Sequence, residues 1–251
     1  MLKILRERLK QGHRTIAFPG RAPVLPPRFR GTPSIDPAKC GPGCMQCADA
    51  CSQRAIVRGS RLELDMGRCV FCGACVTACP TGALRLTNGF AMATRTLDGL
   101  VYSCGQLELA RALEPRLLSV FGKSLKLRQV SAGGCNACEA DINVLGTVVF
   151  DLGRFGIQIV ASPRHADGLL VTGPVTVNMR QALLETYDAT PDPRLVIACG
   201  ACAISGGPFR DSAHVHNGVE GIIPIDLYVP GCPPHPLTIL DGLLRLLGRI
   251  S

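Results

Sequence analysis

Residues 69–80 read CVFCGACVTACP, and this stretch decides the fold of the front half of the chain. Its spacing is C-x2-C-x2-C-x3-C-P, in which three close cysteines wrap one face of a 4Fe-4S cluster and the fourth ligates a second cluster. The small residues Gly73 and Ala74 let backbone N–H groups approach the sulfurs, and Pro80 redirects the chain. The motif therefore predicts a pair of iron–sulfur clusters.

A second cysteine loop, CGPGCMQCADAC at residues 40–51, precedes the first as part of an internal repeat. It has one extra residue after Cys40, and Ser52 stands where proline is expected. Gly41 and Gly43 can absorb the insertion because glycine tolerates positive φ. A zinc site is the alternative, but zinc sites usually use two well-separated cysteine pairs. The predicted ligands are set one, Cys40, Cys44, Cys47 and Cys79, and set two, Cys69, Cys72, Cys75 and Cys51.

From residue 126 onward, short β-rich runs alternate with helical patterns. The strands are expected at 127–130, 156–161, 168–175, 195–198 and 222–229, and the helices at 139–154, 178–188 and 237–247. This alternation predicts a parallel sheet with helices on both faces, and ligands at the carboxyl ends of its strands. Cysteines follow three of those strands. We call them the proximal set: Cys135, Cys138, Cys202 and Cys232.

The order CxxC, GxCxxxGG, PGCPP in this half resembles the small subunit of NiFe hydrogenases. The segment SPRHADGLLVTGPVT at 162–176 is similar to the homologous 20 kDa subunit of respiratory complex I and to the small subunits of energy-converting hydrogenases. This resemblance, over about residues 126–248, implies a flavodoxin-like fold with one 4Fe-4S cluster, the proximal one, facing a large subunit. The front segment resembles bacterial two-cluster ferredoxins.

The expected fold class is therefore α/β and α+β, with a flavodoxin-like parallel α/β domain preceded by a two-cluster ferredoxin-like domain. The expected organisation is an extended arm (1–33), the ferredoxin-like domain (34–87), a connector (88–125) and the flavodoxin-like domain (126–251). The arm is proline-rich and begins with an amphipathic pattern at 1–10, which favours a helix docked on its own protein or on a partner. In the connector we expect a strand at 94–103 and a helix at 107–121, interrupted by Pro115.

Four residues near the ligand sets have open roles. Cys104 and Cys199 match no ligand position, and we expect them to be small buried side chains. Glu139 and Asp141 resemble the acidic pair of energy-converting hydrogenases, which implies cluster tuning or proton traffic. Alternatively, the two carboxylates only stabilise the N-terminus of a helix through its dipole, and we weigh the two interpretations equally.

The formal net charge of +8 invites a nucleic-acid interpretation. Ligating cysteines are thiolates, however, and three oxidised clusters with twelve thiolates bring the charge to about +2. The basic residues are scattered and there is no tryptophan, so we expect no nucleic-acid partner. No apolar run approaches the length of a membrane span, and no secretory signal is recognisable. We expect a cytoplasmic protein, peripheral on the cytoplasmic face of the inner membrane through partner subunits.

The chain shows no dinucleotide loop, no Walker A loop, no Ser/His/Asp arrangement and no nickel-ligating cysteine pairs. We therefore expect a non-catalytic electron-transfer subunit with three 4Fe-4S clusters, acting with a hydrogenase-like large subunit in a membrane-associated complex. A ferredoxin, a formate dehydrogenase or a carbon monoxide dehydrogenase could supply its electrons. A complex I-like subunit serving quinone is the alternative, against which the separated Cys135 and Cys138 argue. A free-standing iron–sulfur sensor is the third hypothesis.

Overall fold

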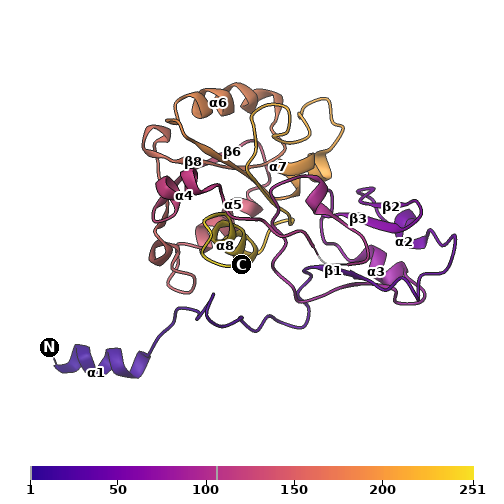
Figure 1. Cartoon of the computed structure of the whole chain (residues 1–251), viewed down its shortest axis with the longest axis horizontal. Helices are drawn as coiled ribbons and strands as arrows, with labels where there is room; N and C mark the ends of the chain where they lie inside the picture. Colours follow the sequence, from indigo (N-terminus) through magenta and orange to yellow (C-terminus); the bar gives the residue numbers. More distant parts are fainter. Residues whose placement is uncertain (1, 106) are drawn as a thin grey trace.

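The computed structural model describes residues 2–105 and 107–251. A small region rich in cysteine loops lies beside a larger α/β region, and the first helix projects away from both (Figure 1). Besides the elements introduced below, the described chain contains α4 (Pro115–Phe121), α7 (Ala201–Ser205) and the 3-10 turns η1 (Asp98–Leu100), η2 (Leu152–Phe155), η3 (Pro163–His165) and η4 (Gly207–Phe209).

The larger region is built on a five-stranded parallel sheet. Its strands are β6 (Leu125–Ser131), β7 (Ile157–Ile159), β8 (Gly168–Thr172), β9 (Leu195–Cys199) and β10 (Leu227–Val229). They are ordered β10-β9-β8-β6-β7, and every neighbouring pair is parallel. Counted along the chain within this sheet, the order is 2-1-3-4-5, which is the flavodoxin-like order. The predicted fold class is confirmed.

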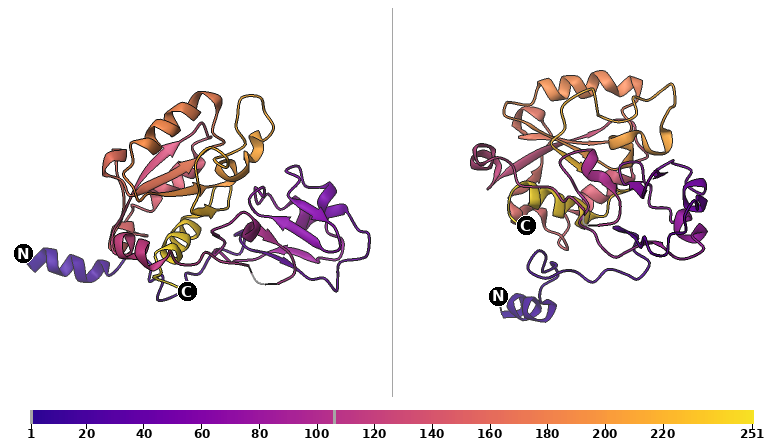
Figure 2. Two further views of the ribbon diagram at one scale, coloured as in Figure 1. Left: turned by 45° about the horizontal axis from the view of Figure 1, so that its top comes forward. Right: turned by 45° about the vertical axis from the view of Figure 1, so that its right-hand side comes forward.

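Alternate side chains of β8, β9 and β10 enter two separate cores. Leu169 and Val171 of β8 pack in one core with Leu183 of α6 (Val177–Asp188). Leu170 points to the other core, which contains Ile142 of α5 (Ala137–Val144) and most of α8 (Pro236–Leu246). Both views show α6 on one face of the sheet and α8 on the opposite face (Figure 2). Because helices cover both faces, the strands β8, β9 and β10 are buried on both sides, whereas β6 and β7 carry exposed polar side chains.

The smaller region repeats a short strand, a cysteine loop and a short helix. Its elements are β1 (Pro33–Ile35), α2 (Gln46–Asp49), β2 (Ile56–Arg58), β3 (Leu62–Asp65), α3 (Ala74–Ala78) and β4 (Leu84–Leu86). The antiparallel pair β1–β4 joins the start of the first repeat to the end of the second. The pair β2–β3 joins the two repeats in the middle, and β5 (Val101–Tyr102) adds a third strand from the connector.

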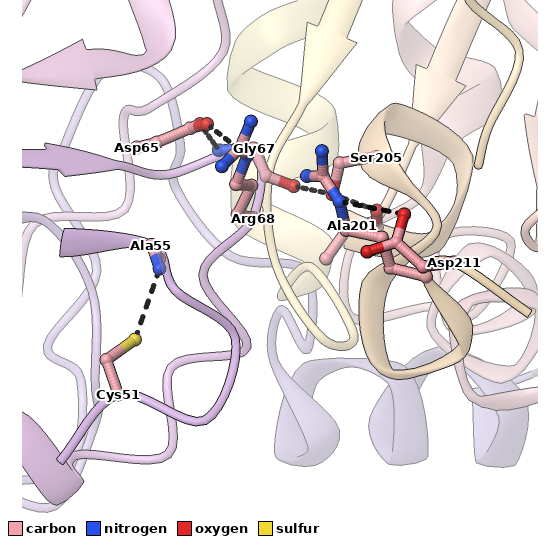
Figure 3. A network of polar contacts seen from close by, with 9 residues as sticks. Cys51, Ala55, Asp65, Gly67, Arg68, Ala201, Ser205 and Asp211 are labelled. Carbon is pink, nitrogen blue, oxygen red and sulfur yellow. Dashed lines mark hydrogen bonds and ion pairs between the residues drawn. The ribbon is translucent and has the colours of Figure 1, made fainter. Parts of the chain in front are cut away.

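The two regions share a hydrophobic core. Met66 and Leu100, both fully buried, belong to the same core as Ala203 and Ile204 of α7. The hydroxyl of Ser205 donates to the carbonyl oxygen of Gly67 at 2.8 Å, directly across the junction (Figure 3). Removing this apolar surface from water is favourable in proportion to its area, so the packing holds the regions together.

Several elements are shorter than the sequence predicts. The helix expected at 107–121 begins only at Pro115, because proline has no backbone N–H and suits the first helical position. The strand expected at 222–229 is limited to β10, and residues before Leu227 form a loop. The strand expected at 94–103 is reduced to an isolated bridge between Thr94 and Tyr228 and the short β5. The helix expected at 139–154 ends as α5 at Val144.

The amphipathic pattern at the start does form a helix, α1 (Leu2–Gln11), but none of its residues is buried. In the described structure, α1 therefore does not dock on the rest of its own chain. Among the described residues, no helix combines the length and the apolar character needed to cross a bilayer.

Candidate iron–sulfur sites

The four cysteines predicted as set one line a single cavity in the smaller region. The other lining residues come from the same region, including Leu62, Pro80 and Leu84. Burial raises the pKa of Cys47, and the neighbouring Cys40 and Cys79 contribute to the rise. The structure thus places Cys79, from the second loop, with three cysteines of the first loop. This crossed arrangement is the one that the two-cluster motif predicts.

Arg58, the last residue of β2, anchors the irregular first loop. Its Nη1 donates to Cys40 Sγ at 3.0 Å and to the carbonyl oxygen of Cys44 at 3.1 Å. Its Nη2 donates to the carbonyl oxygen of Gly41 at 3.0 Å. Hydrogen bonds from a charged group are stronger than neutral ones, so this side chain holds the inserted residue in place. Sequence reasoning missed Arg58, because its loop partners lie 14–18 positions earlier.

The four cysteines predicted as set two line a second cavity, together with Ala55, Leu64, Phe71 and neighbouring residues. The backbone N–H of Ala55 donates to Cys51 Sγ at 3.3 Å (Figure 3), and the N–H of Phe71 donates to Cys69 Sγ at the same distance. Burial raises the pKa of Cys69 to about 12, and the nearby Cys75 and Cys51 contribute to the rise. Without a bound cation this thiol is neutral at pH 7.

The cysteines of the proximal set converge at the carboxyl edge of the parallel sheet. Cys135 and Cys138 follow β6, Cys202 follows β9, and Cys232 follows β10. Burial raises the pKa of Cys202 to about 12, and the nearby Cys232, Cys135 and Glu139 contribute to the rise. The pKa of Cys138 is raised by burial and by the same group of neighbours. The structure therefore brings residues nearly a hundred positions apart to one place.

The proximal set lies partly open to the surface. Cys138 and Cys202 are buried, whereas Cys135 and Cys232 are exposed. Gly200 makes room for the buried sulfur, because a Cβ at this position would lie 2.6 Å from Cys138 Sγ. Gly200 also has a φ of +93°, a conformation that favours glycine.

Glu139 is a buried carboxylate next to Cys138. Its Oε1 accepts hydrogen bonds from the hydroxyls of Ser131 and Thr172, both at 2.6 Å. Burial raises the pKa of Glu139, but these two hydrogen bonds lower it, and the net shift is downward. Burial alone raises the pKa of Asp141. The two acidic residues therefore differ, and Glu139 is the one held as a fixed negative charge.

The two unassigned cysteines lie in different surroundings. Cys199 is fully buried at the end of β9, within the core that contains α8. Burial raises the pKa of Cys199 well above the usual value, and the neighbouring Cys138 contributes to the rise. Cys104 is half-buried in the connector. Neither side chain lines the cavity of set one or set two.

The donor chemistry fits iron–sulfur clusters. Each of the two cavities in the smaller region is lined by four thiols and by mostly apolar neighbours. Thiolate sulfur is the ligand that 4Fe-4S clusters use, four to a cluster. Within the described ranges, no three His, Cys, Asp or Glu side chains lie close enough together to hold a single metal ion. Because burial raises several of the thiol pKa values, ligation must release protons.

Two family models match this chain. Residues 135–246 match the family described as NADH ubiquinone oxidoreductase, 20 Kd subunit, and residues 62–85 match a 4Fe-4S binding domain. The first match contains all four cysteines of the proximal set. The second contains the three-cysteine loop from which set two takes most of its ligands.

Three similar proteins come from different kinds of complex. Formate hydrogenlyase subunit 7 of Escherichia coli is 44% identical over 57% of this chain and 56% of its own length. A probable membrane-bound hydrogenase subunit of Pyrococcus furiosus is 43% identical over 54% of this chain and 81% of its own length. An NADH-quinone oxidoreductase subunit of Bacteroides thetaiotaomicron is 44% identical over 46% of this chain and 59% of its own length.

The chain thus spans a little over half the length of the first and third of these relatives, and most of the second. The sequence similarity agrees with the flavodoxin-like strand order and with the convergence of four cysteines at the edge of the sheet. The chain belongs to the family of the 20 kDa subunit of NADH ubiquinone oxidoreductase, and it carries a 4Fe-4S binding domain in front of the segment that defines this family.

Proposed function

We propose that this chain is the electron-transfer subunit of a multi-subunit oxidoreductase and holds three 4Fe-4S clusters. Sets one and two hold the ferredoxin-type pair, and the proximal set holds the third. The observation that carries the proposal is the grouping of the twelve cysteines. The cysteines of set one and those of set two line separate cavities in the smaller region, and the four cysteines of the proximal set meet at the edge of the sheet. When bound, such clusters accept and release single electrons at potentials that their surroundings set.

The residues around each set would bind the cluster, orient it and shield it from water. The thiols supply the ligands, and apolar neighbours such as Leu84 and Phe71 exclude water from two of the cavities. Arg58 places a positive charge beside set one, whereas Glu139 places a negative charge beside the proximal set. Charges of opposite sign shift the potentials of neighbouring clusters in opposite directions, because the reduced cluster is the more negative form. Set one and the proximal set therefore lie in different electrostatic environments.

We propose the following division of labour along the chain. The arm (1–33) and the connector (88–125) join a two-cluster domain (34–87) to the proximal-cluster domain (126–251). The shared core and the Ser205–Gly67 hydrogen bond support a fixed spacing between these domains. A fixed spacing suits electron transfer, since the transfer rate falls steeply with distance.

The partner in this proposal is a hydrogenase-like large subunit that covers the exposed side of the proximal set. Exposure of Cys135 and Cys232 supports this, because a cluster on these ligands needs a second surface to exclude water. The separated Cys135 and Cys138 favour the hydrogenase branch of the family. The P. furiosus relative is named as a hydrogenase subunit and the E. coli relative as a formate hydrogenlyase subunit. Electrons would come from a ferredoxin, a formate dehydrogenase or a carbon monoxide dehydrogenase. The assembly would lie on the cytoplasmic face of the inner membrane.

A complex I-like role next to a quinone site is the second candidate. The 44% identity to the NADH-quinone oxidoreductase subunit of B. thetaiotaomicron favours it. The two candidates differ in the metal content of the partner, because a hydrogenase-type large subunit holds nickel.

Anaerobic isolation of the tagged chain with its native partners tests the proposal. We expect a large subunit to co-purify and nickel to be present at about one atom per complex. A partner without nickel in a complex that reduces quinone would favour the second candidate. A chain that never associates with another subunit would contradict both and would revive the sensor hypothesis.

A further inference from the structure

We propose that Arg30, in the N-terminal arm, is a positioning residue between the two regions. It holds the loop that carries Cys72 of set two against the loop that carries Cys232 of the proximal set. It also places a positive charge beside set two. The inference rests on the proposed function, because it concerns residues around bound clusters. The sequence alone assigns no chemistry to the arm, so the role comes from the contacts described below.

A cavity between the two regions is lined by ligands from both. Cys72 and Cys232 both border it, together with Arg30 and residues of the PGCPP loop. By contrast, the cavity of set one is lined only by residues between positions 40 and 84. Set two is therefore the ferredoxin-type set that faces the proximal set.

The guanidinium of Arg30 lies on the loop that carries Cys72. Its Nη1 donates to the carbonyl oxygen of Phe71 at 3.3 Å and to that of Cys72 at 2.5 Å. The guanidinium also packs beside Gly73, where a Cβ would lie 3.5 Å from its Cζ atom, an ordinary van der Waals contact. Two carbonyl dipoles directed at one cation fix the loop and keep the positive charge beside it.

The arm is anchored to both regions on either side of Arg30. On one side, the ring of Phe29 meets the ring of His235 edge to face, with centroids 5.3 Å apart. His235 caps α8 and lies three residues after Cys232. On the other side, the N–H groups of Gly31 and Thr32 donate to the carbonyl oxygens of Thr87 and Gly89, where the smaller region meets the connector, at 2.9 and 2.7 Å. Arg30 therefore lies on a short tether between the regions.

A second contact joins set two to the larger region from another direction. The Ser205–Gly67 hydrogen bond links α7, which carries Cys202, to the segment just before Cys69 (Figure 3). With this contact intact, loss of the Arg30 side chain should loosen one edge of the junction rather than separate the regions. The effect of an Arg30 substitution should therefore be local, and it can be measured on folded protein.

Two consequences follow from this placement. A positive charge beside set two stabilises the reduced, more negative cluster and so raises its midpoint potential. A loop held close to Cys232 also strengthens the magnetic interaction between the reduced set-two and proximal clusters, because this interaction falls steeply with distance. The set-one cluster should feel neither effect to the same degree.

The test compares Arg30→Gln, Arg30→Lys and the control Arg28→Gln in the full chain with its clusters. Arg28 is exposed, as Arg30 is, and lies two residues away, but it makes no side-chain hydrogen bond or ion pair within the described residues. The readouts are anaerobic redox titration followed by electron paramagnetic resonance. Arg30→Gln should lower the reduced-to-oxidised ratio of the set-two cluster about tenfold at a fixed potential, which is about 59 mV for one electron. It should also weaken the magnetic coupling to the proximal cluster.

Arg30→Lys separates charge from position. Lysine keeps the positive charge, but its Nζ is one bond nearer the backbone than the Nη1 that donates to both carbonyl oxygens. The set-two potential should therefore stay near the wild-type value while the coupling weakens. The inference is overturned if Arg30→Gln behaves like Arg28→Gln in both readouts, or if the set-one signal shifts instead. It is also overturned if the wild type shows three signals of which only the set-one and proximal signals are coupled. A wild type that lacks one of the three signals would contradict the proposed function itself, and this inference would fall with it.

Discussion

Replacing Gly200 with alanine should expel the proximal cluster while leaving the ferredoxin-type pair in place. Two effects add at this position. The backbone at Gly200 has a φ of 93° and a ψ of 155°, a region that is essentially restricted to glycine, and a Cβ there costs about 1–3 kcal/mol. The new methyl group would also lie 2.6 Å from Cys138 Sγ, so the sulfur must move. Overpacking of this kind costs about 1–3 kcal/mol.

Gly221 offers a control that shares the positive φ but has no contact with a ligand cysteine. Its φ is +75°, but a Cβ there would meet nothing within 4 Å. Gly221→Ala should therefore incur the backbone cost alone and keep all of its iron. If the displaced sulfur returns to a relaxed position when the cluster is lost, the overpacking energy is released at that step. The proximal cluster of Gly200→Ala should then be lost about 5- to 150-fold faster than that of the control.

The assay follows iron release and the proximal paramagnetic signal anaerobically at a fixed temperature. We expect a fast phase that removes about a third of the iron from Gly200→Ala, with the other two signals unchanged. Equal rates of proximal-cluster loss in the two variants would refute the reasoning, because the contact with Cys138 would then have no effect on ligation. Loss of all three signals together would refute it as well, since the damage would not be local.

Three further substitutions test other parts of the account. Arg58→Gln removes three charge-assisted hydrogen bonds from the first loop, so the iron content should fall from about twelve to about eight atoms per chain. The control Arg61→Gln, at an exposed position, should retain about twelve. Full iron content in both variants would contradict the role of Arg58. Cys232→Ser should abolish the proximal paramagnetic signal and Cys199→Ser should not; the same loss in both would show that the ligand assignment is wrong. Glu139→Gln removes a fixed negative charge beside the proximal cluster. In a redox titration, the reduced-to-oxidised ratio of this cluster should rise on the order of tenfold at a fixed potential. A lower ratio would contradict the placement of this charge.

The cysteine loops and the sheet were predictable because each depends on local patterns. The spacing from Cys69 to Cys79 implies the crossed ligation that groups Cys79 with Cys40, and the cavity of set one has that composition. Alternating apolar runs implied a parallel sheet, whose 2-1-3-4-5 order agrees with the flavodoxin-like expectation. Ligation of clusters by these cysteines stays a prediction, which the cysteine substitutions and iron analyses test.

The parts that sequence reasoning missed depend on contacts between distant residues. Nothing in the local sequence distinguishes Arg58 or Arg30 from other arginines, because their partners lie up to 18 and 42 residues away in the chain. The error in the connector helix has a local cause that the sequence did contain. Pro115 does not interrupt a helix but begins one, since a missing N–H and a fixed φ suit a helix start. The short β10 reflects a loop before Leu227 whose apolar residues imitate a strand.

Iron, sulfide and zinc analysis of the anaerobically prepared chain tests the central claim most directly. Three cubane clusters on twelve cysteines require about twelve iron and twelve sulfide per chain, with a brown colour and three reducible paramagnetic centres. A value near eight iron would remove one cluster from the account and would point to the irregular first loop. Colourless protein, or protein that holds zinc in place of iron and sulfide, would contradict the account as a whole.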